Sequence, residues 1–539
     1  LASITSNPSR YNPITNPENN NTRRQIVLQN MVDQNYISKQ DMENALSDDV
    51  YDRIQNVNTA TKETNSHYSY FTDELIEQVT EALMKKLGYT ESQASNLVYS
   101  GGLKIYTTQD PKIQAIVDEE VNDPGNYTVA KYSVEYRLSV NHADGTTQHY
   151  SEENLRAYRK NTLGDTSFEG LYNSKEEVQA DIDRYKEWLL KDGDDVIAER
   201  QNLILQPQAS FFIMDQHTGE VKALSGGRGE KTASRTLNRA TNVYRQPGSS
   251  FKVLTAFAPA IDTCGATLGT VYYDAPYTIG TKTFRNWWGE SRGFTGYSNI
   301  REGIIYSMNI VAVRTLMETV TPQLGVEYAE NLGITSLTKD DLGAALSLGG
   351  ITKGVSNMEL TAAYAAIANG GVYTTPRFFT KILDHDGKVL IDNEPETKQV
   401  LKDSTAFLLT DAMSESMKAN RKFARSGVSI NSTSTRAALT GMSAAGKSGT
   451  TTSNNDVWFV GFTPYYTAGV WGGCDNNQKL KHGGVDNGGT SFHKDIWRNI
   501  MNRVHEGLED PGFTVPDSVE TAEICRKSGK RAVSGVCDH

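Results

Sequence analysis

The sequence has few cysteines, few histidines and no long apolar run. Its 539 residues include four cysteines and nine histidines. No two cysteines have the Cys-x-x-Cys spacing of a metal site, and we expect neither a metal ion nor another cofactor. No apolar run reaches the roughly 18 residues that a membrane-spanning helix requires. The sequence begins at Leu1 without a signal-like segment, so we expect a processed form whose membrane anchor lies upstream.

The sequence also has fewer basic than acidic residues. The 54 lysines and arginines are outnumbered by 65 aspartates and glutamates, which gives a formal net charge of −11. This balance argues against nucleic acid as a partner. A hydrophobic content of 37% with 22% charged residues is typical of a globular protein, and the length predicts about three domains. We find no internal repeat and no low-complexity run.

The cysteines leave two alternatives open. Cys264 lies in a helix-like segment and Cys474 beside a strand, and we expect both to be lone buried thiols. Cys525 and Cys537 flank a polar tail, and a disulfide between them is as plausible as two separate thiols. A metal site that also uses His539 is a poorer interpretation, because too few other ligands are close in sequence.

The rest of the chain is organised around the stretch Gln246-Pro247-Gly248-Ser249-Ser250-Phe251-Lys252. An apolar run follows, and the pattern predicts a helix with Ser249 in its first turn. Ser249 and Lys252 are three residues apart, so their side chains lie on one helix face. A lysine can take the serine proton only if its pKa is lowered, and the positive end of the helix dipole favours that. Alone, Ser-x-x-Lys arises by chance about twice in such a chain.

Two later segments support a catalytic interpretation. Ser307 and Asn309 place a hydroxyl and an amide two residues apart in a segment of helical character. Lys447-Ser448-Gly449-Thr450 puts a second lysine beside small residues, ahead of an apolar strand over 457–462. Small residues there would let a ligand backbone lie along a strand edge.

The order Ser-x-x-Lys, Ser-x-Asn, Lys-Ser-Gly resembles the active-site triplet of penicillin-binding proteins and serine β-lactamases. One departure is that Ser448 stands where the family usually has threonine, which preserves the hydroxyl. From Pro8 to Cys537 the chain resembles class A (bifunctional) penicillin-binding proteins. Its Pro-Ser-Arg-Tyr-Asn-Pro stretch resembles the close of their glycosyltransferase domain. The catalytic glutamate motif of that domain is missing, so we expect a fragment without glycosyltransferase activity.

The residues and the resemblance together assign roles to five catalytic side chains. Ser249 is the expected nucleophile, and Lys252 its general base, kept neutral by burial and by the charge of Lys447. Ser307 can relay a proton to the leaving amine, and Asn309 can hold an amide of the bound chain. Lys447 polarises Ser307 and attracts a substrate carboxylate.

The substrate-binding residues are expected on and just after the second-lysine motif. The set is Ser448, Gly449, Thr450 and Thr452, with the threonine hydroxyls directed at the substrate carboxylate. The backbone N–H groups of Ser249 and Thr450 are candidates for an oxyanion hole, where one donor is typically worth ~3 kcal/mol. Trp287 and Trp288 could line a groove, but are as readily explained as core residues.

The predicted fold class is α/β (α+β), an antiparallel sheet covered by helices on both faces, joined to an α+β linker domain. The expected boundaries are a glycosyltransferase remnant over 1–48, a linker with an insertion over 49–207, a transpeptidase domain over 208–508 and a tail over 509–539. The main predicted helices cover 19–34, 70–87, 176–190, 362–371 and 492–504, with strands at 103–108, 132–140, 209–215, 220–227, 457–462 and 465–471.

The resemblance implies a D,D-transpeptidase at the extracytoplasmic face of a bacterial cell membrane. Such an enzyme attacks the D-Ala-D-Ala end of a peptidoglycan stem peptide, forms an acyl-enzyme at Ser249 and passes the acyl group to an amine of a second stem peptide. Penicillin and other β-lactam antibiotics resemble the donor and acylate the same serine. Cell-wall assembly proteins are possible further partners.

Two other functions stay open. A serine β-lactamase needs a second base to activate water, and Met308 replaces the acidic middle residue typical of class A lactamases. A D,D-carboxypeptidase differs only in water access, which motif residues do not reveal. A non-catalytic β-lactam sensor on the same fold would require a signalling module that the sequence does not display.

Overall fold

The computed structural model describes residues 3, 10–14, 16–51, 69–418, 422–481 and 489–537. It divides the chain into two compact units, 1–68 and 69–539. The first unit contains helices α1 (Pro17–Asp33) and α2 (Lys39–Ser47). Ser38 caps α2, because its hydroxyl accepts from Asp41 N while the Asp41 carboxylate accepts from Ser38 N. Part of the Pro-Ser-Arg-Tyr-Asn-Pro stretch lies outside the described residues.

The second unit is built on a five-stranded antiparallel sheet. Its strand order is β17 (Ala445–Thr450), β18 (Asp456–Phe462), β19 (Thr467–Gly473), β5 (Gln208–Met214) and β6 (Val221–Ser225). Every residue of β5, β18 and β19 is buried. Strands buried on both faces require cover on both sides of the sheet. The predicted sheet with helices on both faces is therefore confirmed.

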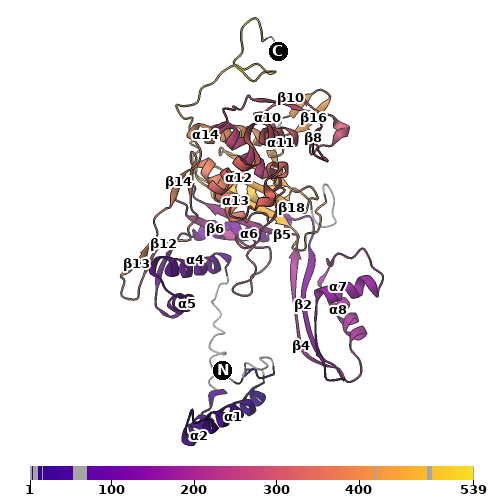
Figure 1. The fold of residues 1–539 in the computed structure, drawn as a ribbon, viewed down its shortest axis with the longest axis vertical. Coiled ribbons are helices and arrows are strands. Elements are labelled where there is room, and N and C mark those ends of the chain that lie inside the picture. The colour runs from indigo at the N-terminus through magenta and orange to yellow at the C-terminus, as the bar shows by residue number, and fades with distance from the viewer. Residues whose placement is uncertain are drawn as a thin grey trace. The chain divides into compact units, whose positions relative to one another are not determined.

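Successive residues of β5 belong to different hydrophobic clusters. Phe211 packs with helices α6 (Pro111–Asn122) and α15 (Phe492–Val504), whereas Phe212 packs with helix α4 (Tyr70–Leu87). This alternation follows from the two-residue period of a strand. Helix α13 (Asn357–Ala368) contributes to the cluster that contains Trp458 and Trp471, on the opposite side of the sheet from α6 (Figure 1).

A small second sheet adjoins the first. It consists of β1 (Lys104–Thr107), β12 (Phe379–Leu383) and β13 (Val389–Asp392), and β1 pairs antiparallel with β12. Helix α4 has the bounds predicted from its apolar spacing, but α5 (Glu91–Ser100) was not predicted. The expectation of a half-buried strand at 103–108 is wrong in detail, since three of the four β1 residues are exposed.

Residues 131–206 form an arm with its own core. Strands β3 (Thr147–Ser151), β2 (Lys131–Asn141) and β4 (Asp195–Gln206) make its sheet, and α7 (Glu152–Asn161) and α8 (Lys175–Leu189) lie on one side of the long β2–β4 ribbon (Figure 1). Tyr136, Tyr158 and Tyr185 belong to its hydrophobic cluster. The return strand β4 was not predicted, because most of it is exposed and its apolar residues do not alternate with polar ones.

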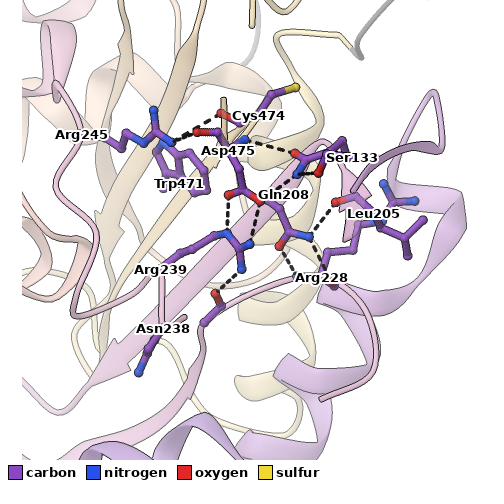
Figure 2. Close-up of polar contacts among 12 residues, drawn as sticks. Ser133, Leu205, Gln208, Arg228, Asn238, Arg239, Arg245, Trp471, Cys474 and Asp475 are labelled. Atoms are coloured by element: carbon purple, nitrogen blue, oxygen red, sulfur yellow. Dashed lines mark hydrogen bonds and ion pairs between the residues drawn. The ribbon is translucent and has the colours of Figure 1, made fainter. Parts of the chain in front are cut away.

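Asp475, just after β19, ties the arm to the central sheet. It accepts hydrogen bonds from Gln206 Nε2 at the end of β4 (2.7 Å) and from Arg239 Nε and Nη2 (2.6 and 2.7 Å). Its backbone carbonyl accepts from Arg245 Nη2 at 2.7 Å (Figure 2). Arg245 lies four residues before Ser249, so one aspartate connects the arm with the segment that leads to the predicted nucleophile.

Shorter elements surround the centre of the molecule. The helical ones include η2 (Gly248–Ser250), η3 (Val253–Phe257), α9 (Ala258–Asp262), α10 (Ile300–Ile305), α11 (Asn309–Arg314), α12 (Pro322–Asn331) and α14 (Asp403–Met417). The two-stranded antiparallel pairs are β7 (Val271–Asp274) with β10 (Gly296–Asn299), β8 (Tyr277–Ile279) with β9 (Lys282–Phe284), β11 (Val372–Thr374) with β14 (Thr397–Gln399), and β15 (Lys422–Arg425) with β16 (Val428–Asn431).

All four cysteines are free thiols in this structure. Cys474 is buried as predicted, but Cys264, two residues beyond the end of α9, is only partly buried. Hydrogen bonds from Ser528 lower the pKa of the Cys525 thiol to about 7. His539 lies outside the described residues, among which no cluster of three or more potential metal ligands occurs. Within the same residues, no helix combines the length and apolarity needed to cross a membrane.

Candidate active site

Ser249 occupies a 3₁₀ turn at the start of an irregular helix. The turn η2 leads through Lys252 into the π-helical segment η3, so the predicted helix is present but is not a regular α-helix. Ser249 is partly exposed, whereas Lys252 is completely buried. Ser250 Oγ donates to Pro247 O (2.8 Å) and Tyr364 Oη donates to Ser250 O (2.6 Å). These bonds fix the backbone on which Ser249 is carried.

Glycines allow three backbones to meet at this turn. A Cβ on Gly248, which has φ of +57°, would lie 2.6 Å from Thr450 O. A Cβ on Gly349 would lie 2.5 Å from Gly248 N, and one on Gly449 would collide with Pro247 O. The small residues expected to admit a ligand thus also bring β17 and the 344–350 loop against the serine turn. No larger side chain fits at these positions without moving the backbone.

Ser307 lies between two buried lysines. Lys252 Nζ donates to Ser307 O (2.7 Å) and Asn309 Oδ1 (2.6 Å), and is 3.2 Å from Ser307 Oγ. Lys447 Nζ donates to Ser307 Oγ and to Ser448 O, both at 2.9 Å. A hydroxyl can accept from one amine while it donates to another that is unprotonated. Ser307 can therefore carry a proton between the two lysines.

The expected segment of helical character consists of two short helices, α10 and α11, with Ser307 in the turn between them. Ser307 has φ of +52°, a left-handed conformation that is rare for a serine. Asn309 is the first residue of α11, and the side chain of Asn286 accepts from Asn309 N (2.9 Å) and Ile310 N (3.2 Å). Strained residues of this kind are concentrated at functional sites.

Burial dominates the electrostatics of the lysines. It holds the pKa of Lys252 well below the usual value, and the charge of Lys447 lowers it further. Burial and the charge of Lys494 lower the pKa of Lys447 to about 7. Neither Lys252 nor Lys447 forms an ion pair with any described residue. Lys252 is thus suited to be a neutral base at neutral pH, as the sequence predicted on the same two grounds.

The second-lysine motif forms strand β17, which is an edge strand of the central sheet. Ser448 is buried and its Oγ donates to Thr433 Oγ1 at 2.9 Å, while Thr450 is exposed at the end of the strand. Thr452 is exposed in the turn that follows. An edge strand offers unpaired backbone groups to which an extended peptide can add. The residues of the three motifs, apart from Thr452, therefore lie close together beside Ser249, at the edge of the central sheet that β17 forms.

Comparison with known proteins identifies the family. Residues 209–502 match the family model described as the penicillin binding protein transpeptidase domain, which is more than half of the chain. The chain belongs to this family. All the residues predicted to act in catalysis lie within the matched segment, and so do those predicted to bind the substrate. Family membership establishes a penicillin-binding transpeptidase domain, that is, an acyltransferase of peptidoglycan synthesis.

Relatives of this penicillin-binding family match almost the whole chain. Penicillin-binding protein 1A of Clostridium botulinum is 31% identical over 98% of this chain and 55% of its own length. Penicillin-binding protein 1A of Aquifex aeolicus is 28% identical over 96% of this chain and 67% of its own length. The chain therefore spans about half the length of the clostridial relatives that it matches.

Solved penicillin-binding proteins have the same fold. The crystal structure of penicillin-binding protein 1A from Haemophilus influenzae covers 99% of this chain with a TM-score of 0.60 at 20% identity, and the match includes 83% of that protein. PonA1 of Mycobacterium tuberculosis, in complex with penicillin V, covers 83% of this chain with a TM-score of 0.56 at 22% identity and 96% of its own chain. At these identities the likeness shows the fold alone.

The structure adds residues that sequence analysis missed at this candidate site. Asn286 caps α11, Thr433 contacts Ser448, and Lys494 donates to Thr433 O at 2.8 Å. They come from loops and helices distant in sequence, and no local pattern marks them. Trp287 and Trp288 were expected either to line a groove or to be core residues. Trp288 is buried in the core, whereas Trp287 is 49% exposed and donates to Tyr306 O at 2.9 Å.

Proposed function

We propose that this chain is a serine-type D-Ala-D-Ala transpeptidase that cross-links peptidoglycan stem peptides. The observation that carries the proposal is that Ser307 Oγ contacts both Lys252 and Lys447. Of these two lysines, Lys252 lies one helical turn after Ser249. A buried amine without an acidic partner is a base, and a buried hydroxyl between two amines is a proton relay.

In the proposed acylation, Ser249 Oγ attacks the carbonyl carbon of the penultimate D-alanine. Its proton passes to the neutral Lys252 Nζ as the new ester C–O bond forms. The peptide C–N bond then breaks, and the departing D-alanine amine receives a proton from Lys252 by way of Ser307 Oγ. The backbone N–H groups of Ser249 and Thr450 stabilise the oxyanion.

In the proposed deacylation, an amine of a second stem peptide attacks the ester carbonyl. The amine loses a proton to Lys252, and Ser249 recovers its proton as the C–O bond breaks. The new amide is the cross-link. Water in place of the amine would give D,D-carboxypeptidase activity through the same steps, so exclusion of water decides between the two outcomes.

Substrate binding is assigned to the residues around β17. Lys447 supplies positive charge for the terminal carboxylate, and Ser448, Thr450 and Thr452 supply hydroxyls, while Gly449 lets the backbone of the strand approach the serine turn. The side-chain carbonyl of Asn309 accepts from Lys252 Nζ and so orients that amine. Its amide nitrogen donates one hydrogen to Arg285 O, which leaves the second hydrogen for the bound peptide. A β-lactam would acylate Ser249 as an analogue of the donor.

The proposal extends to the whole protein. We assign 1–48 to the end of a glycosyltransferase domain, 49–207 to a linker, 208–508 to the transpeptidase and 509–539 to a tail. Most of the glycosyltransferase domain would then lie outside this chain, which would not polymerise sugars. The protein would act at the extracytoplasmic face of a bacterial membrane, anchored by an upstream segment, with possible cell-wall assembly partners.

The test uses a peptide that ends in D-Ala-D-Ala, with and without an added amine acceptor. The expected result is release of D-alanine with formation of an amide product that increases with acceptor concentration, and loss of both in Ser249→Ala. Release that ignores the acceptor would indicate a carboxypeptidase. Absence of release with intact folding would contradict the proposal.

A further inference from the structure

A buried carboxylate outside the three motifs lies two hydrogen bonds away from Asn309. Asp274, the last residue of β7, is 1% exposed. Its oxygens accept from Asn286 Nδ2 (2.7 Å), from Thr295 N (2.8 Å) and from Thr295 Oγ1 (2.7 Å). No lysine or arginine among the described residues forms an ion pair with it. Burial of a carboxylate without a cation is costly, so this position requires more of the side chain than its shape.

Asp274 holds the side chain of Asn286 in one orientation. A carboxylate offers only acceptors, so it pairs with the nitrogen end of the Asn286 amide. The oxygen end is then directed at the start of α11, where Asn286 Oδ1 accepts from Asn309 N (2.9 Å) and Ile310 N (3.2 Å). A neutral amide in place of Asp274 could pair with either end of Asn286 and would not enforce this orientation.

Asn309 in turn contacts the predicted general base. Its Oδ1 accepts from Lys252 Nζ at 2.6 Å, and its Nδ2 donates to Arg285 O at 2.8 Å. On the other side of the same turn, Trp287 Nε1 donates to Tyr306 O at 2.9 Å. The segment around Asn286 therefore holds the turn on both sides of its strained residue, where a small displacement would move the carbonyl that orients the amine.

A second row of hydrogen bonds reaches Asp274 from the opposite direction. Thr295 Oγ1 donates to the carboxylate and therefore accepts from Ser298 Oγ at 2.7 Å. Ser298 Oγ accepts from Arg425 Nη2 at 2.8 Å. Both hydroxyl residues are 1% exposed. The donors on both sides of Asp274 point towards it, so this carboxylate is the acceptor on which the network depends.

We propose that Asp274 is a positioning residue of the candidate active site, which acts through Asn286 on Asn309 and so on the Lys252 amine. The inference rests on the proposed transpeptidase function, in which Lys252 takes the proton of the nucleophile. Asp274 itself touches neither the substrate nor the reacting atoms. It determines which end of the Asn286 amide faces α11, and this fixes the carbonyl that orients Lys252 Nζ before acylation begins.

The test measures the limiting rate of acylation by a saturating labelled penicillin in samples whose folding is checked by urea denaturation. Asp274→Asn removes the requirement for one amide orientation, and Asn286→Asp puts two carboxylates in contact. We expect each to lower the limiting rate by about tenfold or more, since misplacement of a catalytic group slows the chemical step. The double variant Asp274→Asn/Asn286→Asp exchanges donor and acceptor and restores the pattern, so it should recover most of the rate.

Asp262→Asn is the matched control. Asp262 is 8% exposed, accepts from Tyr328 Oη and Lys402 N (both 2.8 Å), and forms no ion pair among the described residues. None of its hydrogen bonds reaches a motif residue. We expect Asp262→Asn to lose stability and to keep the wild-type limiting rate. Wild-type rates in folded Asp274→Asn and Asn286→Asp, or a double variant as slow as either single one, would overturn the positioning role.

The outcomes separate this inference from the proposed function. A wild-type chain that is acylated and releases D-alanine, with unchanged rates in the variants, would overturn the positioning role alone. A folded wild-type chain that reacts with neither penicillin nor peptide would overturn both. Thr295→Val removes one donor from the carboxylate and nearly keeps the side-chain shape, so it tests the same role if Asp274→Asn does not fold. A lower limiting rate in Thr295→Val supports the role, and an unchanged rate would overturn it.

Discussion

Lys447 Nζ donates a hydrogen bond to Ser307 Oγ at 2.9 Å, in a site where both side chains are buried. The bond joins a residue of the edge strand β17 to the turn between α10 and α11. It brings the charge of Lys447 close enough to Lys252 to lower the pKa of that amine. The two lysines therefore titrate as a linked pair, and the linkage has consequences for activity and for stability.

Acylation should depend on pH through both lysines. Because the pKa of Lys447 is about 7, this group loses its charge, and its attraction for a substrate carboxylate, as the pH rises above that value. We expect the second-order rate constant of acylation to decline from pH 7 to 9, and to decline also in acid as Lys252 becomes protonated. Lys447→Arg stays charged, so it should be slower but level from pH 7 to 9. The same decline in Lys447→Arg would contradict this assignment.

Stability should rise with pH over the range in which the folded lysines are neutral. The folded pKa of Lys447 is about 7 and the unfolded value about 10.4, so the unfolded chain binds more protons between these limits. The free energy of unfolding should therefore increase with pH across that window, by up to about 1.4 kcal/mol per pH unit for one group. Urea denaturation of Lys447→Met should give a shallower slope than wild type, and identical slopes would refute the linkage.

A methyl group on Gly349 should displace the serine turn. Its Cβ would lie 2.5 Å from Gly248 N, and its φ of +72° is also unfavourable for alanine. Gly370→Ala is the matched control, since Gly370 has φ of +61° and open space around its Cβ position. We expect Gly349→Ala to be less stable than Gly370→Ala by about 2 kcal/mol and slower in acylation. Equal stability and equal acylation would argue against the close packing.

Loss of the Asp475 carboxylate should loosen the attachment of the arm. Asp475→Ala would leave the Arg239 guanidinium, which is 6% exposed, without its anion (Figure 2). We expect a loss of about 2–3 kcal/mol in thermal or urea denaturation, less than for a fully buried pair because Asp475 is 23% exposed. Glu520→Ala breaks the exposed pair with Arg531 and should cost less than about 0.5 kcal/mol. Similar effects for the two variants would count against this anchor.

Much of the central domain could be predicted from its apolar strands. The runs at 209–215 and 457–462 have no polar face, and such runs become strands covered on both sides. Helix α4 was predictable because its apolar spacing is regular and Ser69 caps it. Helices α5 and α7 were not predictable, because their residues are mostly polar. Strand β4 was not, because most of it is exposed and its structure depends on pairing with β2.

The candidate site could be predicted as far as its motifs extend. Ser249, Lys252, Ser307 and Lys447 belong to short patterns whose order is informative. Lys494 and Asn286 belong to no such pattern, since each acts across a contact that only the fold creates. The left-handed conformation of Ser307 was equally hidden, since it occurs in the turn between α10 and α11, where Lys252 donates to Ser307 O.

The most direct test of the account is mass spectrometry of the intact protein after incubation with a labelled penicillin. The account predicts one stable adduct per chain that persists for hours, and no adduct on Ser249→Ala. Rapid loss of the adduct with turnover of the drug would indicate a β-lactamase instead. An adduct that survives in Ser249→Ala, or no adduct on the folded wild-type chain, would contradict the assignment of Ser249 as the nucleophile.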